Sequence, residues 1–536
     1  MGTSTAGRAA QAVALLAGFY LLALAIVAGM IGIDVALASW GRGGPLVAKI
    51  VVLTIAVAYP VVRLVFLTRR PADGGGDAGL PVTREQQPEL WARVDRIAEQ
   101  TGVRGPAEIR LVPVVNAGVR EDTRLLGLLP GKRHLELGVP LLLGLTEAEL
   151  DAVLAHEFGH YSNRDVRLAG VTVAGREALR HTITGLHSRA GDANAAERAR
   201  AEQKAAQRAA KGRKAKPVDT RAVHDGTVDR ALAQVFTAYA KLYFRRSEAV
   251  SRRQEYAADQ AAVQVAGRDA TAAALRRLPV LDQAYDFYQR RYVTLGWEAG
   301  LLPMPGQVYG GFADLLADPK RRAELAELGL ELPEPEPDPY DSHPPVNQRI
   351  AAVLALPDDG RGPDTSGPAS ALLHEPELTL ARLEDLTLVA EAAAKRRTDW
   401  VELVQEAQLA RYREDAAPVF AALTALGLPA TVDGLLDAVD SGRQWEVADR
   451  LPRSAEAAAA TGRAAREFAR PRLGGALADL AVLALAEAGR ARWEFSWSTA
   501  AVAHLPEGLS EAVSAATTDT PDTAPLRALL APADAH

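Results

Sequence analysis

Two long apolar runs near the start of this 536-residue chain constrain its fold more than any other feature. Residues Ala12 to Ile33 are apolar apart from Tyr20, and Leu46 to Leu67 form a second run after a short polar break. Each run is long enough to cross a bilayer, where a helix satisfies all of its own backbone hydrogen bonds. The sequence therefore predicts a transmembrane helical hairpin within residues 1–70, with spans at about 12–33 and 46–67.

A cleaved signal peptide is the alternative for the first run, because Ala36-Leu37-Ala38 resembles a cleavage site. The run is too long for the apolar core of a signal peptide, and a second run follows at once, which favours the hairpin. Basic residues are in slight excess on the terminal side of the hairpin, for example at Arg8, Arg69 and Arg70. By the positive-inside rule, both ends of the hairpin and the domain that follows should face the cytoplasm.

The composition excludes some classes of function and favours helix. The chain has no cysteine, so disulfides and thiolate metal ligands are excluded and any zinc must be held by histidine and carboxylate. The net charge of −6 is too mild to indicate a nucleic-acid partner. Alanine is used heavily and aromatic residues are few, which favours a mainly α fold.

The segment from His156 to His160 reads H-E-F-G-H and carries the clearest chemical signal in the chain. Histidines four residues apart lie on one face of a helix, where both imidazoles can bind one Zn²⁺. Glu157 is then placed to act as a base on a metal-bound water, which is the chemistry of peptide hydrolysis. Residues Thr146 to Glu149 have the form of a capping box, so a helix is predicted from about Thr146 to Tyr161.

A zinc site needs a third protein ligand, and the best candidate lies about a hundred residues further on. Glu255 and Asp259 are four residues apart in a predicted helix from Asp229 to Ala266, so they share one helical face. Glu255 can bind the metal, and Asp259 can hold a ligand histidine by its ring N–H. Most E-x-x-x-D pairs are solvated helix faces, so the pair alone is a weak signal.

Three elements in this order resemble one family. They are H-E-F-G-H-Y at 156–161, S-R-R-Q-E-Y-A-A-D at 251–259, and Ser342-His343-Pro344-Pro345 followed by Arg349. Over roughly residues 85–355 the chain resembles the HtpX-like membrane-associated zinc endopeptidases, family forty-eight of the metallopeptidases, which includes CAAX prenyl proteases and mitochondrial quality-control proteases. The resemblance implies one zinc ion per chain on His156, His160 and Glu255, with Glu157 as the base and Asp259 supporting the site.

Two further assignments come from the same resemblance. It places His343 close to the site, where it could stabilise the oxyanion of the tetrahedral intermediate, although a residue at the helix entry before Pro344-Pro345 is an equal alternative. It also makes Asn116 and Ala117 part of an edge strand that binds the substrate backbone, after a predicted strand from Ile109 to Val115. A loop turn at Asn-Ala-Gly is the alternative there.

The predicted organisation is a hairpin at 1–70, a linker at 71–84 and a zincin-type α+β metallopeptidase domain with a small sheet at 85–356. A linker at 357–370 and a helical accessory domain at 371–536 follow. The catalytic domain includes a basic insertion at about 188–221 and an acidic, proline-rich connector at 331–341. The segment 165–187 carries several basic residues and cannot comfortably span lipid, so only two spans are expected.

The sequence therefore predicts a zinc endopeptidase anchored in the cell membrane. It is expected to act on protein or peptide substrates and not to bind nucleic acid. Misfolded membrane proteins are the substrates that the resemblance suggests. A catalytically silent scaffold working through the C-terminal domain is the alternative, and intact Glu157 speaks against it. A prenyl-protein protease is disfavoured by the small number of spans. The oligomeric state and the cleavage preference are left open.

Overall fold

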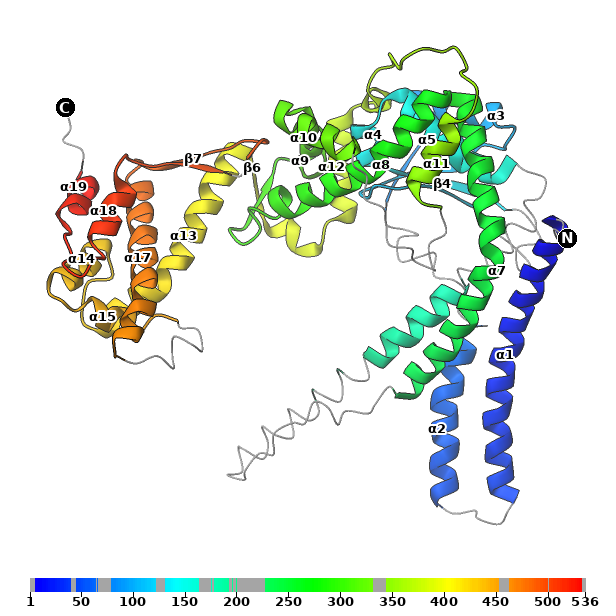
Figure 1. Ribbon diagram of the computed structural model, residues 1–536, viewed down its shortest axis with the longest axis horizontal. Helices are drawn as coiled ribbons and strands as arrows, with labels where there is room; N and C mark the ends of the chain where they lie inside the picture. Colours follow the sequence, from blue (N-terminus) through cyan, green and yellow to red (C-terminus); the bar gives the residue numbers. More distant parts are fainter. Residues whose placement is uncertain are drawn as a thin grey trace. The chain divides into compact units, whose positions relative to one another are not determined.

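The computed structural model describes residues 5–39, 45–63, 65, 79–121, 131–162, 175, 178–191, 195, 199, 227–330, 344–452, 462–499 and 501–532. These residues are mostly helical, as the composition predicts, and the strands are short (Figure 1). They form two compact units. Unit 1 holds Met1–Pro279 and Glu331–His374, and unit 2 holds Val280–Leu330 and Glu375–His536, so that helix α8 contributes to both.

Unit 1 combines the N-terminal helices with a small sheet and the helices around it. Its elements are α1 (Thr5–Ser39), α2 (Pro45–Val62), β1 (Leu80–Val82), α3 (Pro88–Gln100), β2 (Glu108–Val112), β3 (Ala117–Glu121), β4 (Arg133–Gly138), α4 (Val139–Gly144), α5 (Glu147–Ser162), α7 (Thr227–Ala266), the first part of α8 (Arg268–Tyr288), α11 (Val346–Leu354) and η3 (Ala369–Leu372). The residue patterns of Pro88 to Thr101, Ile109 to Val115 and His134 to Val139 predict a helix and two strands, and these are confirmed as α3, β2 and β4, within a few residues at each end.

The sheet has the strand order β1-β2-β4-β3. Strand β2 runs parallel to β4, and the two outer strands run antiparallel to their neighbours. Ile109 and Leu111 of β2 lie opposite Leu135 and Leu137 of β4, and all four side chains are fully buried. This apolar centre fixes the register of the sheet and leaves β3 as an edge strand.

Helix α5 begins at the predicted capping box. The backbone N–H of Thr146 donates to Glu149 Oε2 at 2.9 Å, and the N–H of Glu149 donates to Thr146 Oγ1 at 3.1 Å. Leu150, Leu154 and Phe158 are fully buried, as the helical spacing of apolar residues predicts. The N-terminus of α5 is therefore fixed before the chain reaches the histidines.

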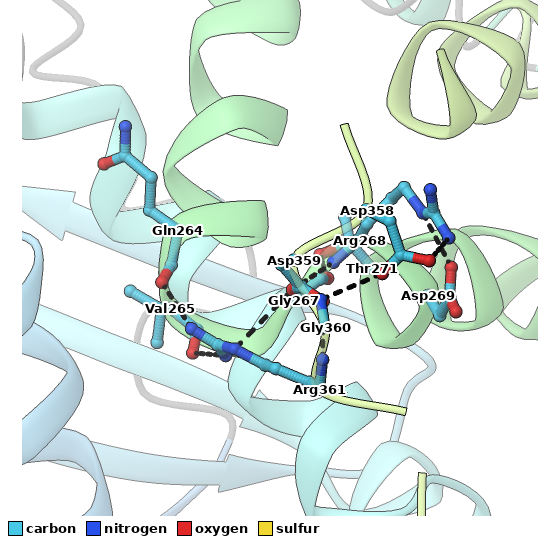
Figure 2. Close-up of polar contacts among 10 residues, drawn as sticks. All are labelled: Gln264, Val265, Gly267, Arg268, Asp269, Thr271, Asp358, Asp359, Gly360 and Arg361. Carbon is cyan, nitrogen blue, oxygen red and sulfur yellow. Dashed lines mark hydrogen bonds and ion pairs between the residues drawn. The ribbon is translucent and has the colours of Figure 1, made fainter. Parts of the chain in front are cut away.

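Residues 358–369, which we call the strap, hold the junction between α7 and α8 (Figure 2). Arg361 Nη1 donates to the carbonyl of Val265 at 2.6 Å, near the end of α7. The carboxylate of Asp359 accepts from the backbone N–H of Arg268 at 3.1 Å, at the start of α8. A cation at a helix C-terminus and an anion at a helix N-terminus both suit the helix dipole.

The other end of the strap binds the start of α5. Thr146 Oγ1 donates to Asp364 Oδ2 at 2.6 Å, and the backbone N–H of Ala148 donates to Ser366 Oγ at 3.1 Å. The N–H of Glu147 donates to the carbonyl of Gly367 at 2.8 Å. One short segment thus satisfies helix termini in three helices, α5, α7 and α8.

The N-terminal half of α7 packs against α1 (Figure 1), and Val61 of α2 belongs to the same apolar cluster. Phe236 and Tyr243 of α7 are fully buried in an apolar cluster with Phe19 of α1. Tyr239 Oη donates to the carbonyl of Leu15 at 2.5 Å. One continuous helix therefore joins the N-terminal apolar helices to the segment that carries Glu255.

Within the described residues, one helix is long and apolar enough to cross a membrane, Ala14–Ser39 in α1. This finding rests on length and composition alone. The second predicted span corresponds to α2, which lies beside α1 and donates a hydrogen bond from Thr54 Oγ1 to Asp34 Oδ1 at 3.1 Å. The two-span hairpin and its orientation stay predictions.

Unit 2 is helical with two small two-stranded sheets, β5 with β6 and β7 with β8. It contains η2 (Gln289–Val293), β5 (Leu301–Pro303), α9 (Gln307–Ala317), α10 (Pro319–Leu330), α12 (Pro376–Thr387), η4 (Ala390–Ala394), β6 (Arg396–Thr398), α13 (Trp400–Ala425), α14 (Val432–Asp440), α15 (Gln444–Ala448), α17 (Gly462–Glu487), β7 (Arg492–Glu494), β8 (Val502–His504), α18 (Leu509–Ala515) and α19 (Ala524–Leu530). Residues Leu378 to Glu414 have the apolar spacing of a helix in the sequence, but this prediction is wrong in the middle, where η4 and β6 separate α12 from α13.

Several predicted features lie wholly or mostly outside the described residues. They are the acidic connector at 331–341, His343, most of the first linker and most of the basic insertion at 188–221. The domain boundaries stay predictions.

Candidate metal centre

The candidate site is built where α5 and the C-terminal half of α7 approach each other. Gly159 lies inside the histidine motif, and a Cβ at this position would be 2.9 Å from the Cα of Ala258 on α7. Real side chains do not tolerate that distance, so glycine is needed for the two helices to pack this closely. A glycine inside a strongly helical motif is itself a signal of close packing, so the role of Gly159 could have been predicted from the sequence.

His156, His160 and Glu255 come together across this contact. Their potential ligand atoms all lie within 4.8 Å of one another. His156 Nε2 is 3.6 Å from Glu255 Oε2, and His160 Nε2 is 3.9 Å from Glu255 Oε1. Tetrahedral zinc with bonds of about 2.1 Å holds its ligand atoms about 3.4 Å apart. The two histidine–glutamate distances are close to this value, so two imidazoles and one carboxylate can supply the three protein ligands of a catalytic zinc site, in which water or substrate takes the fourth position.

Asp259 and Arg349 contact the candidate ligands and hold them in place. His156 Nδ1 is 3.0 Å from Asp259 Oδ1, so an N–H there would donate to the carboxylate and leave Nε2 for a metal. Arg349 of α11 binds the same carboxylate through two nitrogens, at 3.0 Å and 2.6 Å. Arg349 Nη1 also lies 3.6 Å from Glu255 Oε2. The sequence indicates Arg349 only as a residue that follows the His343 element, and the structure gives it a position beside the candidate ligands.

The charges in this cluster are buried and mutually dependent. Asp259 is 3% exposed, Glu255 5% and Arg349 9%. Burial by itself raises the pKa of Asp259, but the hydrogen bonds from His156 and Arg349 outweigh it and bring the pKa to about 2. Burial lowers the pKa of Arg349, and Asp259 more than compensates, so that its pKa is raised. Both groups therefore stay charged at neutral pH.

Glu157 is half-buried on α5, between the two histidines. Its carboxylate is close enough to Arg349 and Tyr161 to contribute to raising the pKa of each. A glutamate beside the metal-binding group is where a general base for an attacking water is needed. His343, the other predicted catalytic residue, lies outside the described residues.

The predicted substrate strand lies next to the same helix. Asn116 is exposed and directly precedes β3, and Ala117 is the first residue of β3. The predicted strand from Ile109 corresponds to β2, which lies inside the sheet, so the exposed edge belongs to the strand that follows Asn116. Tyr161 of α5 donates from Oη to the carbonyl of Val119 at 2.6 Å and so ties β3 to α5. Sequence reasoning missed Tyr161.

Comparison with protein families gives the classification. The model of peptidase family M48 matches residues 85–356, a little over half of the chain. The chain belongs to peptidase family M48. Peptidases of this family are zinc-dependent metallopeptidases, so the resemblance recognised from the sequence is confirmed at the level of the family. No curated protein and no solved structure matches the chain.

The residues matched by the M48 family model include those that form the candidate metal site. The matched residues include α5, the end of α7 that carries Glu255, and Arg349. The family match ends just before the strap, so the residues that cap α5 and join α7 to α8 lie outside it. The family match thus covers the candidate metal-binding group, and the strap that holds the start of α5 lies beyond its end.

Proposed function

We propose that this M48 peptidase is a membrane-anchored zinc endopeptidase that uses Glu157 as its general base. The observation that carries the proposal is the group of His156, His160 and Glu255, whose donor atoms converge within 4.8 Å while Glu157 lies between the two histidines. When bound, zinc would activate water and polarise the scissile carbonyl.

The other steps of the reaction would be carried out by side chains and backbone groups of this chain. Asp259 holds His156 by its ring N–H and keeps Nε2 directed at the metal position. Glu157 accepts a proton from the attacking water and then delivers it to the leaving amine. His343 is proposed to stabilise the negative charge that develops on the carbonyl oxygen. Asn116 and Ala117 would bind the substrate backbone along the edge of β3.

The helix α1 supports membrane attachment, and the proposal extends it to a two-span hairpin with α2. The excess of basic residues on the terminal side supports a catalytic domain on the cytoplasmic side. The proposed substrates are proteins at the cell membrane, including misfolded membrane proteins. A reporter that is active only in the cytoplasm, fused to the C-terminus, tests the orientation. An expressed but silent fusion contradicts it.

The catalytic proposal is tested with the full chain purified in detergent and loaded with zinc. Wild type should bind about one zinc per chain and cleave casein, whereas Glu157→Gln should keep its zinc and lose about 10²- to 10⁴-fold in rate. Glu147→Gln is a matched control, because Glu147 lies in the first turn of the same helix and pairs with Arg93. It should retain activity. Equal rates in wild type and Glu157→Gln, or no activity in either across varied substrates, contradict the proposal.

A further inference from the structure

Strand β3 pairs with β4 along one edge, and we call its other edge the open side. The N–H of Gly138 donates to the carbonyl of Asn116 at 2.7 Å, next to the antiparallel ladder between β3 and β4. Hydrogen-bonded and non-hydrogen-bonded pairs alternate along such a ladder. The carbonyl of Asn116 and the backbone groups of Gly118 therefore face β4, and Ala117 and Val119 turn their backbone groups to the open side.

Tyr161 reaches this open side from α5. Its hydroxyl donates to the carbonyl of Val119, one of the groups that the alternation directs outward. The guanidinium of Arg133 lies over the Tyr161 ring, 4.9 Å from its centre, and Arg133 Nε is 3.5 Å from the carboxylate of Glu121 at the end of β3. Tyr161, which belongs to α5, is thus joined to β3 by its own hydrogen bond and, through Arg133, to Glu121 at the end of the strand.

We propose that Tyr161 is a positioning residue that ties the substrate-binding edge of β3 to the metal-binding helix and closes that edge at Val119. The inference rests on the proposed function. An extended peptide would then pair with the backbone of Ala117 and end its pairing against Tyr161. Because Tyr161 follows His160 directly, the same hydrogen bond sets the register between a bound peptide and the metal position.

This arrangement has a chemical consequence for the substrate. The Tyr161 hydroxyl stands 2.6 Å from the carbonyl oxygen of Val119, in the space that a pairing substrate strand would need, so a substrate N–H is kept away from this carbonyl. Among the described residues, the backbone groups of Ala117 and the N–H of Val119 are the ones on this side that a substrate can pair with. The substrate class that fits is therefore a peptide with a short extended segment beside the scissile bond, and a longer paired strand brings no further gain beyond Val119.

The test separates peptide pairing from chemistry. In the Glu157→Gln background with zinc bound, the Kd of a fluorescent extended peptide is measured with and without Tyr161→Phe. Because the hydroxyl no longer holds β3 against α5, the peptide must order a looser edge on binding, and Kd should rise about fivefold, the effect of losing one stabilising hydrogen bond. In the active enzyme, Tyr161→Phe should raise KM about as much for extended peptides, with little change in kcat, and should leave KM unchanged for a blocked dipeptide too short to pair with β3. Zinc content should be unchanged.

Tyr239→Phe is the matched control, because its hydroxyl also donates to a backbone carbonyl, in α1 and not in β3. It should change neither Kd nor KM. Amide hydrogen exchange supplies a readout independent of activity: Tyr161→Phe should speed exchange in β3 and Tyr239→Phe should not. An active enzyme whose KM is the same in Tyr161→Phe overturns this inference alone. Wild type that neither binds nor cleaves peptides overturns the proposed function as well.

Discussion

The two halves of α7 show how differently one helix can be held. In the N-terminal half, Phe236 and Tyr243 are fully buried in an apolar cluster with Phe19. In the C-terminal half, Glu255 and Asp259 are almost as deeply buried, but their neighbours are imidazoles and a guanidinium. Apolar contacts are non-directional and tolerate repacking, whereas a buried charge is stable only while its partners are present. Substitutions in the two halves should therefore fail in different ways.

The largest effect is expected at Glu255. Glu255→Ala removes one of three candidate ligands, and even partners of metal ligands usually change affinity by 10- to 100-fold. We expect zinc affinity to fall by more than about a hundredfold, with loss of peptidase activity. Competition with a chromophoric chelator measures the affinity. Asp229→Asn is the control in the other half of α7, where Asp229 lies 3.8 Å from Arg189, and it should bind zinc normally. Normal zinc affinity in Glu255→Ala would remove Glu255 from the site.

Arg349 should show the cost of an unpaired buried charge. Arg349→Ala leaves the carboxylates of Asp259 and Glu255 without their cation, which should cost about 3 to 5 kcal/mol of folding free energy. Arg349→Lys should recover only part of it, because a lysine cannot reproduce the two-nitrogen contact with Asp259. Denaturant unfolding with and without zinc measures both. A loss below about 1 kcal/mol for Arg349→Ala would show that the cluster does not depend on its cation.

The apolar half should lose stability without losing the metal. Phe236→Ala empties a fully buried position and should cost about 3 kcal/mol. Zinc affinity should stay within about twofold of wild type, because the site lies more than five turns further along the helix. Val235→Ala, at an exposed neighbouring position, should change stability by about 0.5 kcal/mol or less. If Phe236→Ala also loses zinc, the two halves are coupled more tightly than the comparison implies.

The same comparison explains what the sequence could predict. The charged half carries spaced histidines and carboxylates, and the capping box at Thr146 marks a helix start, so both could be found from local patterns. The apolar half could be predicted as helix, but its packing on α1 could not, because any apolar face fits many partners. Tyr161 and Arg349 act through contacts between distant segments, which short-range spacing does not encode.

The strap shows a further limit of sequence patterns. Its proline, glycine and aspartate content is typical of a linker, and residues 357–370 were predicted as one. In the structure, Arg361 and Asp359 bind the ends of two helices and Asp364 binds the start of a third. The same composition suits a mobile connector and a cap, because both need polar side chains that reach backbone groups. Only the three-dimensional neighbours of these residues distinguish the two.

The smallest expected effect tests whether the strap stabilises α5. Burial raises the pKa of Asp364, but hydrogen bonds from Thr146 and Ser366 outweigh it, so the folded pKa lies below its ordinary value of 3.8. A carboxylate with a depressed folded pKa stabilises the fold above its unfolded pKa and loses that contribution as the pH falls through the folded value. Thr146→Ala should cost about 1 kcal/mol at neutral pH.

Asp364→Asn should lower the midpoint of thermal unfolding at neutral pH, and its difference from wild type should shrink as the pH falls below the unfolded pKa of about 4 and on through the lower folded pKa, where folded wild-type Asp364 becomes protonated. Asp385→Asn, at an exposed position on α12, is the matched control and should follow wild type at every pH. A difference between Asp364→Asn and wild type that is constant across the pH range would mean that the charge of Asp364 does not hold the strap to α5.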